Sequence, residues 1–206
     1  AVTIDNANYA ASSATSLTLN FSGDEIASTA ISGLSVTYED AGSNSISDAS
    51  NEMADGDVAE SYVDAALPAI LSTSWQDTDS DGGIDRAVLT FSESIDITDG
   101  NAGDGFGAIL VNDGSAVTID NANYAASNTS SLTLNFLQDE ITGTAISGLS
   151  ITYDNSGSNA IKDRSSGTLE IGDNIVSLAY VDAAKPAILS AVTGDNNADG
   201  TVDRLT

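Results

Sequence analysis

The sequence predicts an all-β protein built from antiparallel β-sandwiches that repeat along the chain. Short segments such as Leu132–Phe136 and Leu149–Tyr153 alternate apolar and polar residues, which is the period of a half-buried strand. Clusters of Asp, Asn, Gly and Ser separate these segments, as turns do in sandwiches. Long stretches of the sequence also recur within the chain, so the same fold is expected more than once.

The internal repeat is about 118 residues long, which is the length of a domain. Residues 1–48 match residues 116–163 at 35 of 48 positions, with an offset of 115. A second match joins residues 62–71 to residues 180–189, with an offset of 118. We therefore expect one domain per repeat and not a solenoid of small units.

The phase of the repeat predicts three parts. Residues 1–64 correspond to the later part of a preceding repeat, residues 65–182 to one complete repeat, and residues 183–206 to the opening of a following repeat. On this interpretation the sequence is a window in a longer tandem array.

Seven segments of the complete repeat are predicted strands, because they are short, apolar or alternating, and rich in β-branched residues. Pro68 and Pro186 each precede a first strand, where a missing N–H is least harmful. Asp139–Gly143 is too short for more than one helical turn. The predicted strands are residues 69–72, 87–91, 108–111, 116–119, 132–136, 149–153 and 175–181.

The composition excludes several functions. Five Lys and Arg stand against 31 Asp and Glu, a formal charge of −26 that repels nucleic acid and anionic lipid and attracts divalent cations. The chain has no Cys and no His, so thiolate sites, cysteine nucleophiles and histidine bases are excluded. No apolar run reaches 18 residues, so we expect no direct membrane insertion in this segment.

The acidic loop Asp77–Arg86 is the most specific chemical signal in the sequence. Alternate carboxylates in a turning backbone converge on one point, and Gly82 permits a sharp turn. Hard oxygen ligands in this number suit Ca²⁺. The pattern departs from an EF-hand loop because position 12 is Val88 and not Glu. The predicted ligands are Asp77, Asp79, Asp81, the Gly83 carbonyl and Asp85.

A second loop repeats this pattern 118 residues later. Its predicted ligands are Asp195, Asn197, Asp199, the Thr201 carbonyl and Asp203. An amide replaces one carboxylate, so this site is expected to be the weaker. A solvated acidic turn is the alternative for either loop, but two copies in register make chance a poor explanation.

These motifs together resemble a known class of repeat. The opening D-A-A-x-P, the acidic loop, the L-T-F-S-E of Leu89–Glu93 and the closing Y-V-D-A-A resemble bacterial and archaeal immunoglobulin-like repeats of surface-layer proteins and giant adhesins. The loop itself resembles the D-x-D-x-D-G-x-x-D loops of integrin α-chain propeller repeats. The resemblance implies tandem immunoglobulin-like antiparallel β-sandwiches with calcium-binding loops between strands, in an extracellular, rod-forming protein.

Asp64 and Asp182 stand at the two domain junctions, each 13 residues before an acidic loop. Cadherin-like repeats also place a carboxylate before a linker proline, where it helps to bind Ca²⁺ between domains. A solvated linker acid is the competing interpretation. Asp96, Asp99 and Asp104 form a further acidic cluster, for which a plain acidic loop is favoured over a cation site.

The function expected from these features is structural: a calcium-stabilised stalk, surface layer, adhesin shaft or filament at the cell surface. Its partners would be neighbouring repeats of the same protein, with self-assembly into a filament or layer. A carbohydrate-binding module is the alternative, but Trp75 is the single Trp and Tyr9 and Tyr124 are equally suited to a core. An enzyme is disfavoured because the acids lie in repeated hydrophilic loops and, without His or Cys and with only Lys162 and Lys185, nucleophile activation has few options.

Overall fold

The computed structural model describes residues 4–8, 15–23, 33–39, 45–48, 51–59, 61–98, 109–112, 116–123, 129–137, 141–154, 159–165, 169–172 and 175–206. These residues form strands, turns and bends and no helix, so the all-β prediction is confirmed at this level. In this part of the chain no helix is long and apolar enough to cross a membrane. The chain divides into two compact units, Ala1–Ala66 and Leu67–Thr206.

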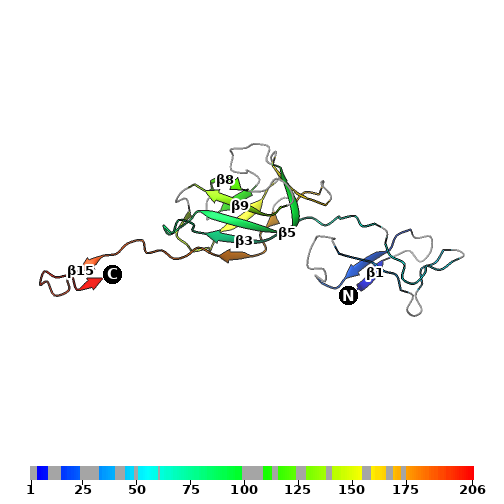
Figure 1. Cartoon of the computed structure of the whole chain (residues 1–206), viewed down its shortest axis with the longest axis horizontal. Helices are drawn as coiled ribbons and strands as arrows, with labels where there is room; N and C mark the ends of the chain where they lie inside the picture. Colours follow the sequence, from blue (N-terminus) through cyan, green and yellow to red (C-terminus); the bar gives the residue numbers. More distant parts are fainter. Residues whose placement is uncertain are drawn as a thin grey trace. The chain divides into compact units, whose positions relative to one another are not determined.

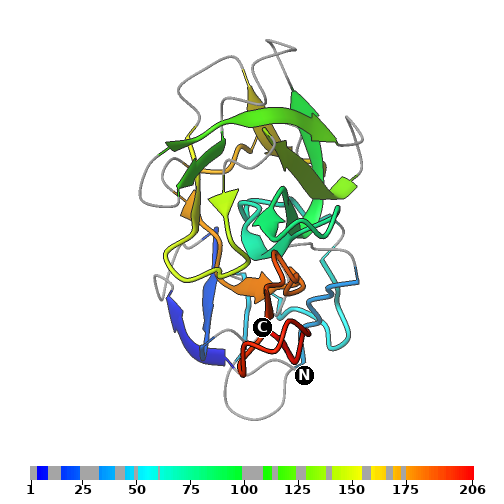
Figure 2. The same cartoon turned by 90° about the vertical axis from the view of Figure 1, so that its left-hand side faces the viewer.

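The main sheet of the second unit has six strands in the order β14–β3–β5–β9–β8, with β12 beside β5 (Figures 1 and 2). The central strand β5 is 13 residues long and pairs with β3 and β9 through its first part and with β12 through its last residues, Ile95–Thr98. The bounds are β3 (Ile70–Gln76), β5 (Arg86–Thr98), β8 (Ile119–Asn123), β9 (Thr129–Phe136), β12 (Ala160–Asp163) and β14 (Tyr180–Asp182).

A second sheet of four strands has the order β13–β11–β6–β7. Its strands are β6 (Ile109–Asn112), β7 (Ala116–Val117), β11 (Ser150–Tyr153) and β13 (Ile175–Val176). Two small two-stranded antiparallel sheets complete the unit. They are β4 (Gly83–Ile84) with β10 (Ile141–Thr142), and β15 (Thr193–Gly194) with β16 (Arg204–Leu205).

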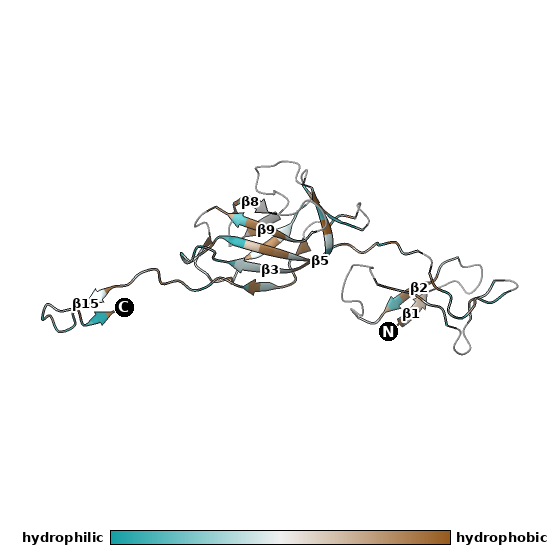
Figure 3. Ribbon diagram, viewed as in Figure 1, coloured by the Kyte–Doolittle hydropathy of each residue, from teal (hydrophilic) through white to brown (hydrophobic). Residues whose placement is uncertain are grey.

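The core of the second unit follows from the alternation of its strands. Along β5, every second side chain from Ala87 to Ile97 is buried, while the residues between them are partly or fully exposed. Figure 3 shows hydrophobic (brown) and hydrophilic (teal) residues along the same strand. One continuous apolar cluster takes residues from both sheets, among them Leu89 and Ile151. Trp75 is fully buried, with ring centroids 6.1 Å from Phe136 and 6.2 Å from Tyr180.

Three details differ from the sequence-based expectation. The main sheet is mixed and not wholly antiparallel, because β14 pairs with β3 in parallel. The predicted strand 175–181 is two strands, β13 and β14, which pair in different sheets. The segment Ala160–Asp163 was not predicted as a strand, yet it forms β12 and pairs with Ile95–Thr98.

The first unit contains a hairpin of β1 (Ile4–Asn8) and β2 (Thr18–Phe21). Its register matches that of β8 and β9 residue for residue, including the irregularity after Ile4 and after Ile119. The paired residues of the two hairpins are identical in sequence and have the same register.

Candidate metal centre

The first acidic loop joins β3 to β4 and then to β5, so both of its ends are held by the main sheet. The Asp85 N–H donates to the Gln76 carbonyl at 3.0 Å and closes the loop at its base. Ser80 and Gly82 have φ angles of 66° and 94°, in the left-handed region. Glycine adopts this conformation without strain. At both positions the left-handed conformation tightens the turn that the alternating carboxylates of the loop need in order to converge.

The loop folds inward because its carboxylates accept hydrogen bonds from its own backbone. Asp77 accepts from the N–H of Ser80 at 2.7 Å and of Gly82 at 3.1 Å. The two carboxylate oxygens of Asp85 accept from the N–H of Thr78 at 3.2 and 3.1 Å. One of them also accepts from the Thr78 hydroxyl at 2.5 Å.

These bonds bring three predicted ligands together. One carboxylate oxygen each of Asp77, Asp79 and Asp85 lies within 4.8 Å of the others. Asp79 is exposed and the other two are half-buried, so the group faces solvent ions. Three carboxylates at this separation match the hard, anionic donor set that Ca²⁺ prefers.

The other two predicted ligands of this loop have backbone roles in the structure. Asp81 Oδ1 accepts a hydrogen bond from the Gly83 N–H at 2.9 Å. Gly83 pairs with Thr142 in the β4–β10 ladder. Their part in binding a cation stays a prediction.

The carboxylates of Asp77, Asp79 and Asp85 are close enough to repel one another when no cation is bound. The Asp81 N–H donates to Asp79 and lowers its pKa, but desolvation and the charges of Asp81, Asp85 and Asp77 together raise the pKa of Asp79 above its usual value. The side chain of Arg86, which follows this loop in the sequence, donates a hydrogen bond from its Nε to Asn135 Oδ1 at 3.0 Å. A bound cation would offset the repulsion.

The second loop, between β15 and β16, repeats this backbone arrangement. Asp195 accepts from the Gly200 N–H at 2.8 Å, as Asp77 does from Gly82. Asp203 accepts from the Asn196 N–H at 2.8 Å, as Asp85 does from Thr78. Ala198 and Gly200 have φ angles of 56° and 87° and take the places of Ser80 and Gly82.

The second loop differs in its charges. Asp199 accepts hydrogen bonds from the Thr201 hydroxyl, the Thr201 N–H and the Asn197 amide, and these lower the pKa of Asp199. Its carboxylates do not form a close group of three within the described residues. The amide at Asn197 has replaced a repelling charge with a hydrogen-bond donor.

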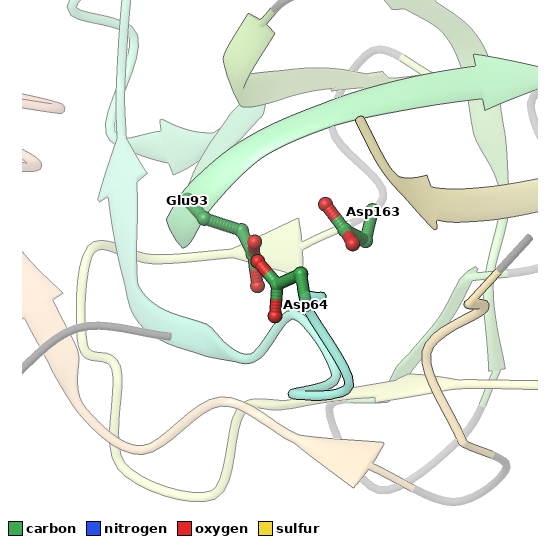
Figure 4. A group of neighbouring side chains, drawn as sticks. All are labelled: Asp64, Glu93 and Asp163. Carbon is green, nitrogen blue, oxygen red and sulfur yellow. The ribbon is translucent and has the colours of Figure 1, made fainter. Parts of the chain in front are cut away.

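The two junction acids are in different environments. Asp182 ends β14 and accepts from the Ala184 N–H at 3.2 Å, in an exposed position. Asp64 is buried, and its carboxylate lies within 4.8 Å of those of Glu93 and Asp163, which are also buried (Figure 4). Buried carboxylates this close are unfavourable as three separate charges unless a cation or protons offset them.

Glu93 and Asp163 were not predicted as site residues. A signal for both exists in the sequence, because each occupies the apolar phase of its strand. Glu93 alternates in step with Phe91 and Ile95, and Asp163 in step with Ile161. A carboxylate in a core-facing position is unusual and marks a special environment.

The remaining candidate residues offer less. Trp75 is buried, so its face cannot stack on a sugar in this structure. Asp96 forms an ion pair with Arg164 at 2.9 Å. Asp99, Asp104, Tyr9 and Tyr124 lie outside the described residues.

Comparisons with protein-family models, with curated proteins and with solved structures found no match to this chain. The resemblance to immunoglobulin-like repeats therefore stays a prediction carried by the motifs alone.

Proposed function

We propose that this chain is a calcium-stabilised structural module of an extracellular repeat protein. The observation that carries the proposal is the loop Asp77–Asp85, in which three carboxylates converge on one point at a turn held by the main sheet. The same backbone turn occurs again at Asp195–Asp203. A bound Ca²⁺ would supply the positive charge that each loop lacks and would cross-link its two ends.

The finer fold that we propose is an immunoglobulin-like β-sandwich, repeated in tandem. Its support is the apolar cluster to which both the six-stranded and the four-stranded sheet contribute. The shared register of the β1–β2 and β8–β9 hairpins supports the repetition.

The ligands that we propose for the first ion are Asp77, Asp79, Asp81, the Gly83 carbonyl and Asp85. Those for the second are Asp195, Asn197, Asp199, the Thr201 carbonyl and Asp203. Affinities of about 10⁻⁴ to 10⁻³ M are expected, as in extracellular modules, with the second site weaker. Asp64 and Asp182 are proposed as additional ligands at the junctions, and Asp64 has the stronger support because of its burial beside two carboxylates.

Calorimetric titration with Ca²⁺ tests the loop sites. The wild-type chain should bind Ca²⁺ with millimolar or tighter affinity, and Asp85→Asn should remove one ion from the stoichiometry. Asp203→Asn should remove a weaker one. Asp57→Asn, an equal change of charge at an exposed position outside the loops, should leave the titration unchanged. Absence of Ca²⁺ uptake at millimolar ion would refute the proposal.

The role of such a module is mechanical: a stalk, surface layer, adhesin shaft or filament at the cell surface, in contact with neighbouring repeats. We propose no catalytic role. The carboxylates of the loop are exposed or half-buried, so they lack the burial that usually tunes a general acid or base. Hydrolysis of glycans or peptides by the purified chain, abolished by an Asp substitution outside the two loops, would contradict this.

A further inference from the structure

Two strands far apart in the sequence, β3 and β14, lie side by side in the main sheet and run in the same direction. β3 is the first strand of the second unit along the chain, and β14 is the last strand of the main sheet along the chain. The other strand pairs of this sheet are antiparallel. The parallel pairs are Tyr180–Thr73, Val181–Ser74 and Asp182–Trp75.

Backbone hydrogen bonds extend this pairing beyond the three residues of β14. They join the segment from Leu178 to Ala183 to the segment from Ile70 to Trp75. These bonds run from the Leu178 N–H to the Ile70 carbonyl at 3.0 Å, from the Thr73 N–H to the Ala179 carbonyl at 2.9 Å, and from the Ala183 N–H to the Trp75 carbonyl at 2.9 Å.

Tyr180 holds β14 to both sheets of the second unit. Its ring stacks on Trp75 of β3, with ring centroids 6.2 Å apart and an interplanar angle of 27°. Its hydroxyl accepts a hydrogen bond from the N–H of Ile151, in β11 of the four-stranded sheet, at 3.2 Å. In the first unit the counterpart Tyr62 accepts from the N–H of Val36, the counterpart of Ile151, at 2.9 Å. The tyrosine contact therefore occurs in both units.

The other partner, β3, is fixed in the sheet by β5. Residue pairs from Ile70–Phe91 to Gln76–Arg86 join the two strands. Trp75 is fully buried and also lies 6.1 Å from Phe136 of β9, between ring centroids. A force on β14 is therefore opposed by the whole sheet through β3.

The direction of the pairing decides how these bonds respond to tension along the chain. Tension enters the second unit before β3 and leaves its main sheet after β14, so it pulls β3 toward its N-terminal end and β14 toward its C-terminal end. Because the strands are parallel, the two pulls are opposed along one axis and load the hydrogen bonds together in shear. In an antiparallel pair the two pulled ends would be adjacent, and the bonds would open one after another.

We propose that the β3–β14 clamp, formed by Ile70–Trp75 and Leu178–Ala183, bears tension and gives the second unit its resistance to stretching along the chain. The proposal rests on the mechanical role proposed above and assigns that role to a particular strand pair. It requires no bound Ca²⁺.

Single-molecule stretching of the full chain in a chelating buffer tests the clamp. The chain has no cysteine, so handles are attached through pairs of introduced cysteines. Leu67→Cys with Lys185→Cys loads the clamp in shear, because these exposed residues lie before β3 and after β14. Ser80→Cys with Lys185→Cys is the matched pull, because the exposed Ser80 lies beyond the C-terminal end of β3 and the force then peels β14 from that end.

The force that unfolds the second unit should be at least about twofold higher in shear than in peeling at the same loading rate, because hydrogen bonds of similar strength then break together and not in sequence. The two chains differ only in the position of one handle. Equal forces in the two geometries, or a higher force in peeling, would overturn the proposal.

One substitution tests whether the clamp itself sets the force. Ala183→Pro removes the N–H that donates to the Trp75 carbonyl, and it should lower the shear force by at least about a quarter while changing the peeling force little. Ala59→Pro is the matched control, because it removes an N–H that donates to the Val36 carbonyl at 3.2 Å outside the stretched segment, and it should change neither force.

An Ala183→Pro chain that folds, as fluorescence of the buried Trp75 reports, and keeps the full shear force would also overturn the proposal. The comparison of the two pulling geometries decides the matter by itself where this variant does not fold.

The outcome is separate from that of the calcium proposal. The ratio of the two forces in chelator depends on the clamp alone, whereas calorimetric titration depends on the loops alone. A ratio near one with normal Ca²⁺ uptake would remove the clamp and leave the calcium sites. A high ratio without Ca²⁺ uptake would leave the clamp and remove the calcium sites.

Discussion

Asp79 is the residue whose ionisation most directly reports the repulsion inside the first loop. Its pKa is raised although the Asp81 N–H lowers it, because desolvation and three neighbouring carboxylates outweigh that bond. The ionised form is therefore disfavoured in the folded, metal-free protein. Its contribution to stability is present below the unfolded pKa and is lost as the pH rises through the raised, folded pKa.

We predict that Asp79 titrates at a higher pH than Asp199, whose pKa is lowered by the Thr201 hydroxyl and N–H and by Asn197. Carboxyl carbon NMR across the acidic range measures both values. Ca²⁺ should lower the apparent pKa of Asp79, because the cation competes with the proton. The Asp81→Asn variant should also lower it. Asp79 titrating below Asp199 without metal would contradict this account.

Residue spacing alone was enough to predict that Asp77, Asp79 and Asp85 lie close together, because a short turn restricts the directions in which its side chains can point. It was not enough for Glu93 and Asp163. Glu93 lies in β5 and Asp163 in β12, and the pairing of these two strands at Ile95–Asp163 and beyond brings the two carboxylates together. Contacts that depend on the pairing of distant strands are not encoded in any local spacing.

At the scale of elements, alternation predicted the strands that have one face in the core, such as β9 and β11. It did not predict where a continuous run changes sheets. Residues 116–123 divide into β7 and β8, and residues 175–182 into β13 and β14, with each pair of strands split between the two sheets. The run 175–181 is rich in β-formers, whereas residues 120–123 are Asp, Asn and Ala, which are depleted in strands, so neither break follows from propensity and both depend on tertiary pairing.

Two isoleucines at equivalent positions of the sequence repeat predict different mutational costs. Ile161 is fully buried in β12, and Ile161→Ala should lower the free energy of unfolding of the second unit by about 2–5 kcal/mol. Its counterpart Ile46 is 42% exposed, and Ile46→Ala should cost less than about 1 kcal/mol.

Chemical denaturation measures both costs. Fluorescence of the buried Trp75 reports the second unit, and far-UV circular dichroism reports all strands. The two substitutions remove the same atoms from the same sequence context, so each is the matched control of the other. Equal costs at the two positions would show that Ile46 is as buried in solution as Ile161.

At the scale of the molecule, the first acidic loop contacts the segment between β14 and β15. The side chain of Leu189 packs against Gly82, and Ala187 lies beside it. With φ at 94°, Gly82 sits where the loop turns, so this contact depends on the loop's conformation. Order in the loop and order in the C-terminal segment are thereby coupled.

We predict that Ca²⁺ controls stiffness through this coupling. Without metal, the repelling carboxylates should loosen the loop and release Leu189, and at ten times Kd the ion should stabilise each site by about 1.4 kcal/mol. Hydrogen exchange at residues 187–189 should therefore rise on chelation and fall on adding Ca²⁺. Small-angle scattering of a three-repeat chain should change from an extended to a more flexible profile on chelation.

Asp85→Asn should show the metal-free behaviour at all Ca²⁺ concentrations, whereas Asp57→Asn should respond as the wild type does. Identical exchange and scattering with and without Ca²⁺ would confine the metal to a local role in the loop, because neither the Leu189 contact nor the mobility of the chain would then depend on it.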